Sequence, residues 1–443
     1  MIGGVLTRGL IPLGETLHSI LRERQMKGIN LTAANLERPA VLQETLRVFD
    51  VCDGCRRCFN LCPSFETLLD RIDAGESDLS KLKPADYEQV ADECYYCKLC
   101  YNHCPYTPPH RYEIDFPRLM IGWKKLLAQE RGVRWRDWLL VRTDWLGKVG
   151  TTFAPIMNRI MSTRWVRDLL HRLWGIHRDR RLVTFQRETF SGWMKRTRES
   201  RPVPPSPSTQ AVLFSTCLID YHEGEIGKAV LAVLEKNQVE VVRPEQQCCG
   251  MPFFEMGDIA AILKKAEFNL NALKPWVEKG YDVVVPSPSC SLMLKREYPH
   301  LLPTEDCRFV AARTFDVCEY LIKLKKEGKL KTDFSYRPGK IAYHIPCHLR
   351  DQNIGFKSKE LMELTGAKVD MVERCSGHDG IWSVKTEFFD MSMTIADKVV
   401  RELEAAHPDV VVSDCPLAAL QLTQAGGRAV SHPIQVIRQA YGI

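Results

Sequence analysis

The sequence predicts a chain of mixed class, α + α/β: an all-α N-terminal region, a helical connector and a duplicated α/β region. Two cysteine runs of identical spacing lie within the first 105 residues, and a stretch rich in Trp and Arg follows them. After residue 210, short β-branched runs alternate with amphipathic helical patterns, and this order occurs twice. We therefore divide the chain into five segments, 1–45, 46–115, 116–205, 206–335 and 336–443.

Length and composition are those of an ordinary globular protein. The 443 residues suffice for about three domains. Of these residues, 45% are hydrophobic and 26% are charged. Seventeen cysteines, eight of them in the two runs, favour a reducing compartment in which thiolates stay free to bind metal. Because no signal-peptide pattern and no apolar window of about 18 residues is visible, we expect a cytoplasmic protein without a membrane span.

Each cysteine run places Cys at its first, fourth, seventh and eleventh positions and closes on Pro. The runs read CDGCRRCFNLCP from Cys52 to Pro63 and CYYCKLCYNHCP from Cys94 to Pro105. This is the spacing by which bacterial ferredoxins hold 4Fe-4S cubanes, with three thiolates from one loop and the fourth from the other run. Paired zinc sites or disulfides are the alternative, but zinc ribbons have no use for the third in-step Cys. We expect two 4Fe-4S clusters, the first held by Cys52, Cys55, Cys58 and Cys104, and the second by Cys94, Cys97, Cys100 and Cys62.

The segments around the runs are predicted to be helical. In residues 1–45, Leu17, Ile20 and Leu21 lie at helical spacing, which indicates a helical lead-in to which we assign no chemistry. The 30 residues from Ser64 to Glu93 are too many for the linker of a compact ferredoxin. They are similar to the helices that flank each cluster in the helical ferredoxin domains of respiratory dehydrogenases. We therefore expect an all-α two-cluster domain over 46–115.

The connector, 116–205, is basic and rich in tryptophan. It contains seven of the nine Trp, and from Arg111 to Arg201 there are 21 Lys and Arg against 9 Asp and Glu. Three interpretations are open: tryptophans packed inside a helical connector, an apolar stripe with a basic border that docks on a partner or an anionic membrane, or nucleic-acid binding. No base-reading motif accompanies the charge, so we expect no nucleic acid. A Pro/Ser linker from Arg201 to Gln210 closes the segment.

The α/β region is an internal duplication with cysteines at corresponding positions. We expect strands that run up to Cys217, Cys290, Cys347 and Cys415, with long helices over about 223–236, 258–279 and 390–406. The cysteines repeat at offsets of 130, 127 and 125 residues. Strand ends and the turns after them are where α/β folds carry functional groups.

The sequence Cys248-Cys249-Gly250, with Cys217 before it and Cys290 after it, resembles a cysteine-rich motif of known families. It is similar to the CCG domain of heterodisulfide reductases, glycolate oxidase iron–sulfur subunits and anaerobic glycerol-3-phosphate dehydrogenase. The domain order and the HIPCH motif from His344 to His348 most resemble the iron–sulfur subunits of the last of these enzymes. The resemblance implies a protein that carries electrons from a flavoprotein partner towards the membrane quinone pool.

The two CCG repeats depart from the full family pattern. The first repeat has Met293 three residues after Cys290, which leaves four thiolates for a further iron–sulfur cluster or for zinc: Cys217, Cys248, Cys249 and Cys290. The second has Ser376 and Ala418 at the other Cys positions, which leaves Cys347, Cys375 and Cys415. This weaker site needs His344, His348 or His378 as a further ligand, or it is empty. Cys307 and Cys318 fit neither set, and we interpret them as buried small hydrophobes.

The chain has no recognisable site for flavin, nicotinamide or nucleotide, because it lacks G-x-G-x-x-G and P-loop motifs. We therefore expect an electron-transfer subunit of an oxidoreductase rather than a complete enzyme. The first hypothesis is a partner of a flavin-dependent, glycerol-3-phosphate dehydrogenase-like subunit, peripheral on the inner face of the membrane and delivering to quinone. The second is a cytosolic carrier to another redox protein, such as a rubrerythrin-type peroxidase. The third is a CCG module for zinc or thiol redox chemistry, fed by the ferredoxin domain.

Overall fold

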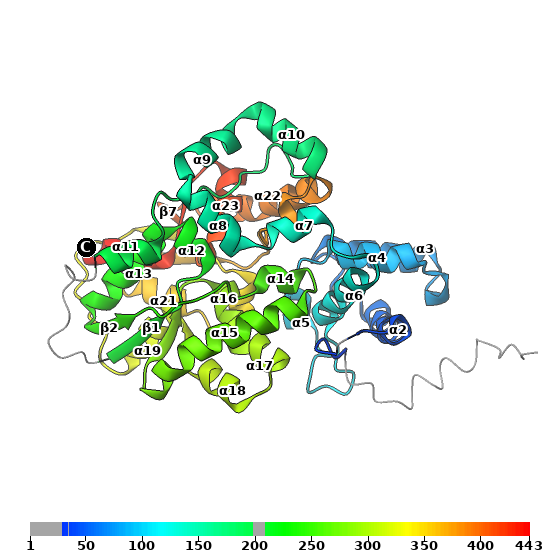
Figure 1. The fold of residues 1–443 in the computed structure, drawn as a ribbon, viewed down its shortest axis with the longest axis horizontal. Helices are drawn as coiled ribbons and strands as arrows, with labels where there is room; N and C mark the ends of the chain where they lie inside the picture. The colour runs from blue at the N-terminus through cyan, green and yellow to red at the C-terminus, as the bar shows by residue number, and fades with distance from the viewer. Residues whose placement is uncertain (1–28, 34, 198–208) are drawn as a thin grey trace, which may run out of the picture.

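The computed structural model describes residues 29–33, 35–197 and 209–443. Most of the predicted helical lead-in, with Leu17, Ile20 and Leu21, and nearly all of the predicted Pro/Ser linker lie outside these ranges. Within them the chain is mostly helical up to residue 196 and α/β after residue 209, so the predicted fold class is confirmed. Figure 1 shows the N-terminal helices at one side of the two sheets and the connector along their upper edge.

The N-terminal helices alternate with the cysteine runs. Pro63 begins α3 and Pro84 begins α4, where the missing N–H of proline costs nothing. Tyr87 stacks on Trp123 with ring centroids 5.6 Å apart, and the Trp123 indole donates to Thr45 over 2.7 Å. These aromatic contacts fix α6 across the other helices. The elements are α2 (Arg38–Cys55), α3 (Pro63–Ala74), the 3-10 turn η1 (Leu79–Lys81), α4 (Pro84–Glu93), α5 (Leu99–His103) and α6 (Phe116–Arg131).

The connector is a series of short helices, of which α9 and α10 form an outlying pair at the top of Figure 1. Its arginines partly serve the protein interior. Arg136 forms a bidentate ion pair with Glu387, and the buried Arg180 donates to Gln421 and, over 2.9 Å, to Ser392. The elements are α7 (Trp135–Leu140), α8 (Thr143–Thr152), α9 (Ala154–Ser162), α10 (Arg164–Trp174) and α11 (Phe190–Arg196).

The first α/β unit contains a four-stranded parallel sheet in the order β2-β1-β3-β4. Its strands are β1 (Thr209–Leu213), β2 (Val239–Val242), β3 (Asp282–Val285) and β4 (Thr314–Asp316). Its helices are α12 (Cys217–Tyr221), α13 (Gly224–Lys236), α14 (Met251–Glu255), α15 (Ile259–Glu278), α16 (Pro288–Leu292), the π-helix η2 (Met293–Glu297), α17 (Tyr298–Leu301), α18 (Glu305–Ala312) and α19 (Val317–Lys326).

The second unit repeats this topology in the order β6-β5-β7-β8, again all parallel. Its strands are β5 (Lys340–His344), β6 (Lys368–Val372), β7 (Val410–Ser413) and β8 (Val430–Ser431). Its helices are α20 (Cys347–Asp351), α21 (Lys357–Glu363), η3 (Trp382–Val384), η4 (Thr386–Phe388), α22 (Phe389–Ala405), α23 (Pro416–Gly426) and α24 (Pro433–Tyr441). One apolar core runs through both units, where α13 packs on α24 and α19 on α21.

The strands end earlier than the sequence predicted. β1, β3, β5 and β7 stop two to five residues before their cysteines, so the expectation that they run up to the cysteines was wrong. Proline is the physical reason at three of the four positions: Pro288, Pro346 and Pro416 cannot donate to a strand ladder but suit the start of a helix. The cysteines therefore lie at or near helix N-termini. Among the described helices, none has the length and apolar content required to cross a bilayer.

Candidate functional site

The first ferredoxin cysteine set surrounds one small cavity. Cys52, Cys55 and Cys58 line it together with Cys104 from the other run, as the crossed arrangement requires. Burial, with the neighbouring Cys104 and Cys55, raises the pKa of Cys58 to about 12. Such a cost disappears when thiolates bind metal cations, because the cation compensates their charge. The donor set fits a 4Fe-4S cluster.

In the second ferredoxin set, Cys62, Cys94 and Cys100 are mutual neighbours. Each raises the pKa of another: Cys94 acts on Cys62, and both Cys62 and Cys94 act on Cys100, although burial is the larger cause. The thiol of Cys97 lies against the thiols of Cys347 and Cys375 in the second α/β unit. The ferredoxin loop therefore reaches the second CCG cysteines directly, which the sequence did not predict.

The first CCG set, Cys217, Cys248, Cys249 and Cys290, is brought together as predicted. The Sγ atoms of Cys217 and Cys248 are 3.8 Å apart, and the Cys249 thiol interacts with Cys248 and Cys290. Four sulfurs bound to one tetrahedral ion at ~2.3 Å would be about 3.8 Å from one another, so the spacing fits such an ion. Donation from the Cys217 and Cys249 thiols holds the pKa of Cys248 well below its ordinary value.

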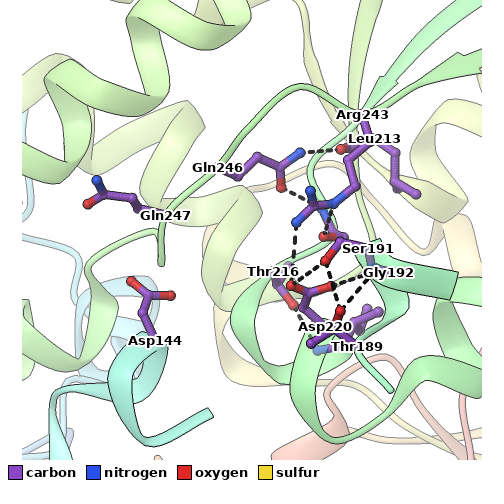
Figure 2. A network of polar contacts seen from close by, with 12 residues as sticks. Asp144, Thr189, Ser191, Gly192, Leu213, Thr216, Asp220, Arg243, Gln246 and Gln247 are labelled. Carbon is purple, nitrogen blue, oxygen red and sulfur yellow. Dashed lines mark hydrogen bonds and ion pairs between the residues drawn. The ribbon is translucent and has the colours of Figure 1, made fainter. Parts of the chain in front are cut away.

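The connector holds the turn that carries this first set. The Cys248 N–H donates to the Asp144 carboxylate over 3.0 Å, and Lys265 pairs with the same carboxylate over 2.8 Å. Figure 2 shows a second contact nearby, where the Asp220 carboxylate accepts from Ser191 and faces Arg243. The connector therefore positions the first CCG site as well as linking two domains.

The second CCG set shares one cavity. Cys347, Cys375 and Cys415 line it with Cys97. The Tyr95 Oη atom lies 3.1 Å from Cys375 Sγ, and the Gly377 N–H donates to the same sulfur over 3.3 Å. Contacts with the Cys347 and Cys97 thiols hold the pKa of Cys375 well below its ordinary value.

The nearby histidines differ in what they can offer a metal. His344 has Nδ1 on Ser413 and Nε2 on the Arg374 carbonyl, each at 3.0 Å. His348 has Nδ1 on Ser289 and Nε2 on the Tyr96 carbonyl, each at 2.8 Å. This geometry disfavours both as ligands. In the described part of the chain the Nε2 atom of His378 is buried without a hydrogen-bond partner and lines the same cavity.

A buried ion network, which the sequence did not reveal, seats the ferredoxin loop on the α/β units. Glu297 is fully buried and accepts from Lys98 over 3.1 Å, Arg118 over 2.8 Å and the Tyr96 hydroxyl over 3.0 Å. Lys98 also pairs with Asp351 over 2.8 Å. These contacts involve three separate segments, and no local motif marks them.

Cys307 and Cys318 are both buried, as expected of small hydrophobes. Cys318 nevertheless lies beside two carboxylates, Asp316 and Asp414, with potential ligand atoms within 4.8 Å of one another. The Cys318 N–H donates to Asp316, and the Tyr343 hydroxyl donates to Asp414 over 2.5 Å. The only sequence signal was the position of Asp414 next to Cys415.

A helical domain with a doubled cysteine run and a duplicated cysteine-rich α/β unit define the chain as an iron–sulfur protein of the electron-transfer type. Two family profiles match: "Citrate utilization protein B Fer4-like domain" over residues 45–127, and "Cysteine-rich domain" (CCG) over 211–295 and 341–423. Curated relatives with the same features identify the family more narrowly.

"Lactate utilization protein A" of Geobacillus thermodenitrificans is 31% identical over 243 residues, which are 52% of this chain and 95% of the relative. The protein of the same name in Bacillus pumilus is 31% identical over 242 residues, 52% of this chain and 96% of the relative. The third relative, from the anaerobic glycerol-3-phosphate dehydrogenase of Escherichia coli, is the C component of that enzyme and is 28% identical over 309 residues, 69% of this chain and 77% of the relative. The chain belongs to the CCG-domain iron–sulfur family that contains these proteins, and the predicted resemblance is confirmed.

Proposed function

We propose that this chain is the iron–sulfur electron-transfer subunit of a flavin-dependent, glycerol-3-phosphate dehydrogenase-like complex and passes electrons towards quinone. Its two ferredoxin cysteine sets would each hold a 4Fe-4S cluster, and the first CCG set would hold a further iron–sulfur centre or zinc. Iron–sulfur clusters carry single electrons, whereas the flavin of the partner handles the chemistry of the substrate. The chain's own residues bind, order and insulate the centres.

One observation carries this proposal: the four cysteine sets lie in series. Cys52 and Cys58 of the first ferredoxin set act electrostatically on Cys100 of the second. Cys375 of the second CCG set acts on Cys62, and Cys290 of the first CCG set acts on Cys415 of the second. Each centre therefore has its neighbour within interaction range, as a chain of one-electron carriers requires.

The surface of α9 and α10 supports docking at a membrane. In the described part of the chain, eleven of the seventeen exposed large hydrophobic residues lie between 133 and 174. Trp165, Leu169 and Leu173 follow one face of α10, with exposed fractions of 68%, 46% and 64%. Five of the seven connector tryptophans are exposed, which disfavours the interpretation that they pack inside the connector.

Exposed basic residues border this face: Lys148, Arg159, Arg164, Arg172 and Arg181. Near an anionic bilayer each basic residue contributes roughly 1 kcal/mol, screened by salt. Arg136 and Arg180, which lie in the two arginine clusters that the sequence suggested for docking, are buried in structural contacts. The docking surface is therefore better assigned to the apolar face of α10 and the exposed residues around it.

The proposal is tested with anaerobically purified full-length chain. Iron, sulfide and zinc are quantified, the clusters are reduced by a photoreduced flavin, and their reoxidation by a menaquinone analogue is followed by visible absorbance. We expect two clusters per chain at least and reoxidation that speeds up on anionic vesicles. A chain that holds only zinc supports the thiol-redox alternative. Reoxidation that ignores vesicles and quinone, but responds to a rubrerythrin-type peroxidase, supports the cytosolic carrier.

The membrane contact has its own test. The variant Trp165→Gln removes the most exposed tryptophan of α10, and Phe309→Gln removes an equally apolar exposed side chain from α18, on the other side of the molecule (Figure 1). We expect only Trp165→Gln to weaken sedimentation with phosphatidylglycerol vesicles, and high salt to release the wild type. Equal binding by both variants at all salt concentrations would refute the membrane contact.

A further inference from the structure

The second CCG repeat lacks one of the four thiolates of the first. The offsets of 125 to 130 residues pair Cys217 with Cys347, Cys248 with Cys375, Cys249 with Ser376, and Cys290 with Cys415. Serine is a poor ligand for thiophilic metals, because its hydroxyl is neither soft nor ionised at neutral pH. By sequence alone the second repeat is therefore one ligand short.

In the structure, Cys97 takes the part that Cys249 plays in the first repeat. There the Cys248 sulfur contacts the Cys217 and Cys249 thiols; in the second repeat the Cys375 sulfur contacts the Cys347 and Cys97 thiols. The two sets of contacts correspond one to one. The thiol absent from position 376 is supplied by the ferredoxin loop, about 280 residues earlier in the chain.

Several contacts hold Cys97 in this place. The carbonyl of Tyr96 is bonded by His348, and the ammonium of Lys98 pairs with Asp351, so the residues on both sides are tied to α20. Tyr96 and Lys98 both have left-handed backbone conformations, with φ of 54° and 60°. Non-glycine residues pay for such conformations, and strain of this kind concentrates at functional sites.

We propose that Cys97 is the fourth thiolate of the second CCG site and that, with Cys347, Cys375 and Cys415, it binds an iron–sulfur centre or a zinc ion. Four thiolates complete a tetrahedral site for either. The cluster motif also assigns Cys97 to the second ferredoxin set, and a thiolate sulfur has lone pairs enough to bridge two metals. This inference rests on the proposed function, because it requires that the CCG site hold metal.

Metal content of anaerobically purified full-length variants tests the assignment. Cys347→Ala defines the iron or zinc that belongs to the second CCG site, and Cys100→Ala defines what is lost with the second ferredoxin cluster alone. We expect Cys97→Ala and Cys97→Ser to lose both shares. Adding Ser376→Cys to Cys97→Ala should restore the share that depends on Cys347 and leave the ferredoxin share missing. The first ferredoxin cluster, by its electron paramagnetic resonance signal, reports that each variant is folded.

Three outcomes would overturn the inference. Cys97→Ala could lose no more metal than Cys100→Ala, or Cys347→Ala could lose none. Alternatively, His378→Gln could remove the metal that Cys97→Ala retains, which would make His378 the fourth ligand. Failure of the proposed function would be seen separately, as wild-type clusters that neither accept electrons from reduced flavin nor pass them to quinone.

Discussion

Replacing Glu297 by Gln removes the one negative charge shared by Lys98 and Arg118 beneath the ferredoxin loop. Burial alone would raise the pKa of Glu297, but these two cations lower it to about 2 from an ordinary value of 4.5. A difference of about 2.5 units corresponds to roughly 3 kcal/mol of folding free energy. Because the folded pKa is depressed, this contribution is complete above about pH 4.5 and is lost as the pH falls through about 2. Breaking a buried ion pair costs a similar ~3–5 kcal/mol.

Urea unfolding of the metal-loaded protein at pH 7 measures this effect. With a slope of roughly 1–3 kcal/mol per molar urea, we expect the midpoint of the first transition to fall by about 1–3 M in Glu297→Gln. The control is Glu278→Gln, which removes a half-exposed partner of Lys274 at 3.7 Å and should cost less than ~0.5 kcal/mol. A midpoint for Glu297→Gln equal to that of the control would refute the role of this network in seating the ferredoxin domain.

Three further predictions concern the centres and the packing between domains. Cys62→Ala should abolish the spectroscopic signal of the second ferredoxin cluster and spare the first; the opposite loss would show that the ligands are not crossed. Gly257→Ala should destabilise the chain by several kcal/mol in thermal unfolding, because its Cβ would lie 2.4 Å from the Lys125 backbone nitrogen at a φ of +76°. Gly280→Ala, with φ of +93° and free space, carries the backbone strain alone and should lose only about 1–2 kcal/mol, so equal losses would contradict the clash. Burial raises the pKa of Asp414 to about 6, so the folded state binds the proton more tightly and stability should fall as pH rises from about 4 to 6. Asp414→Asn should flatten that fall by up to roughly 3 kcal/mol in denaturation at pH 5 and pH 8, and an unchanged pH dependence would contradict it.

Much of the architecture could be predicted because its signals are local. The doubled C-x2-C-x2-C-x3-C-P spacing identified the ferredoxin cysteines, since a loop that caps a cluster needs its ligands at short fixed intervals. The alternation of β-branched runs with helical patterns identified two parallel-sheet units, and the offset between Cys217 and Cys347 identified their duplication. Strand ends were misplaced, because the cysteines after them belong to the following helices.

Tertiary structure alone decided what lies between these units. The contact of Cys97 with Cys347 and Cys375, and the burial of Glu297 between Lys98 and Arg118, join residues 179 to 278 positions apart. No periodicity or spacing encodes such pairs, because they depend on how completed domains pack. The exposure of the α10 tryptophans was undecided for the same reason, since an amphipathic helix has one apolar face whether or not a neighbour covers it. The sequence by itself thus determined which cysteines form sets, and the packing of the domains determined which sets touch.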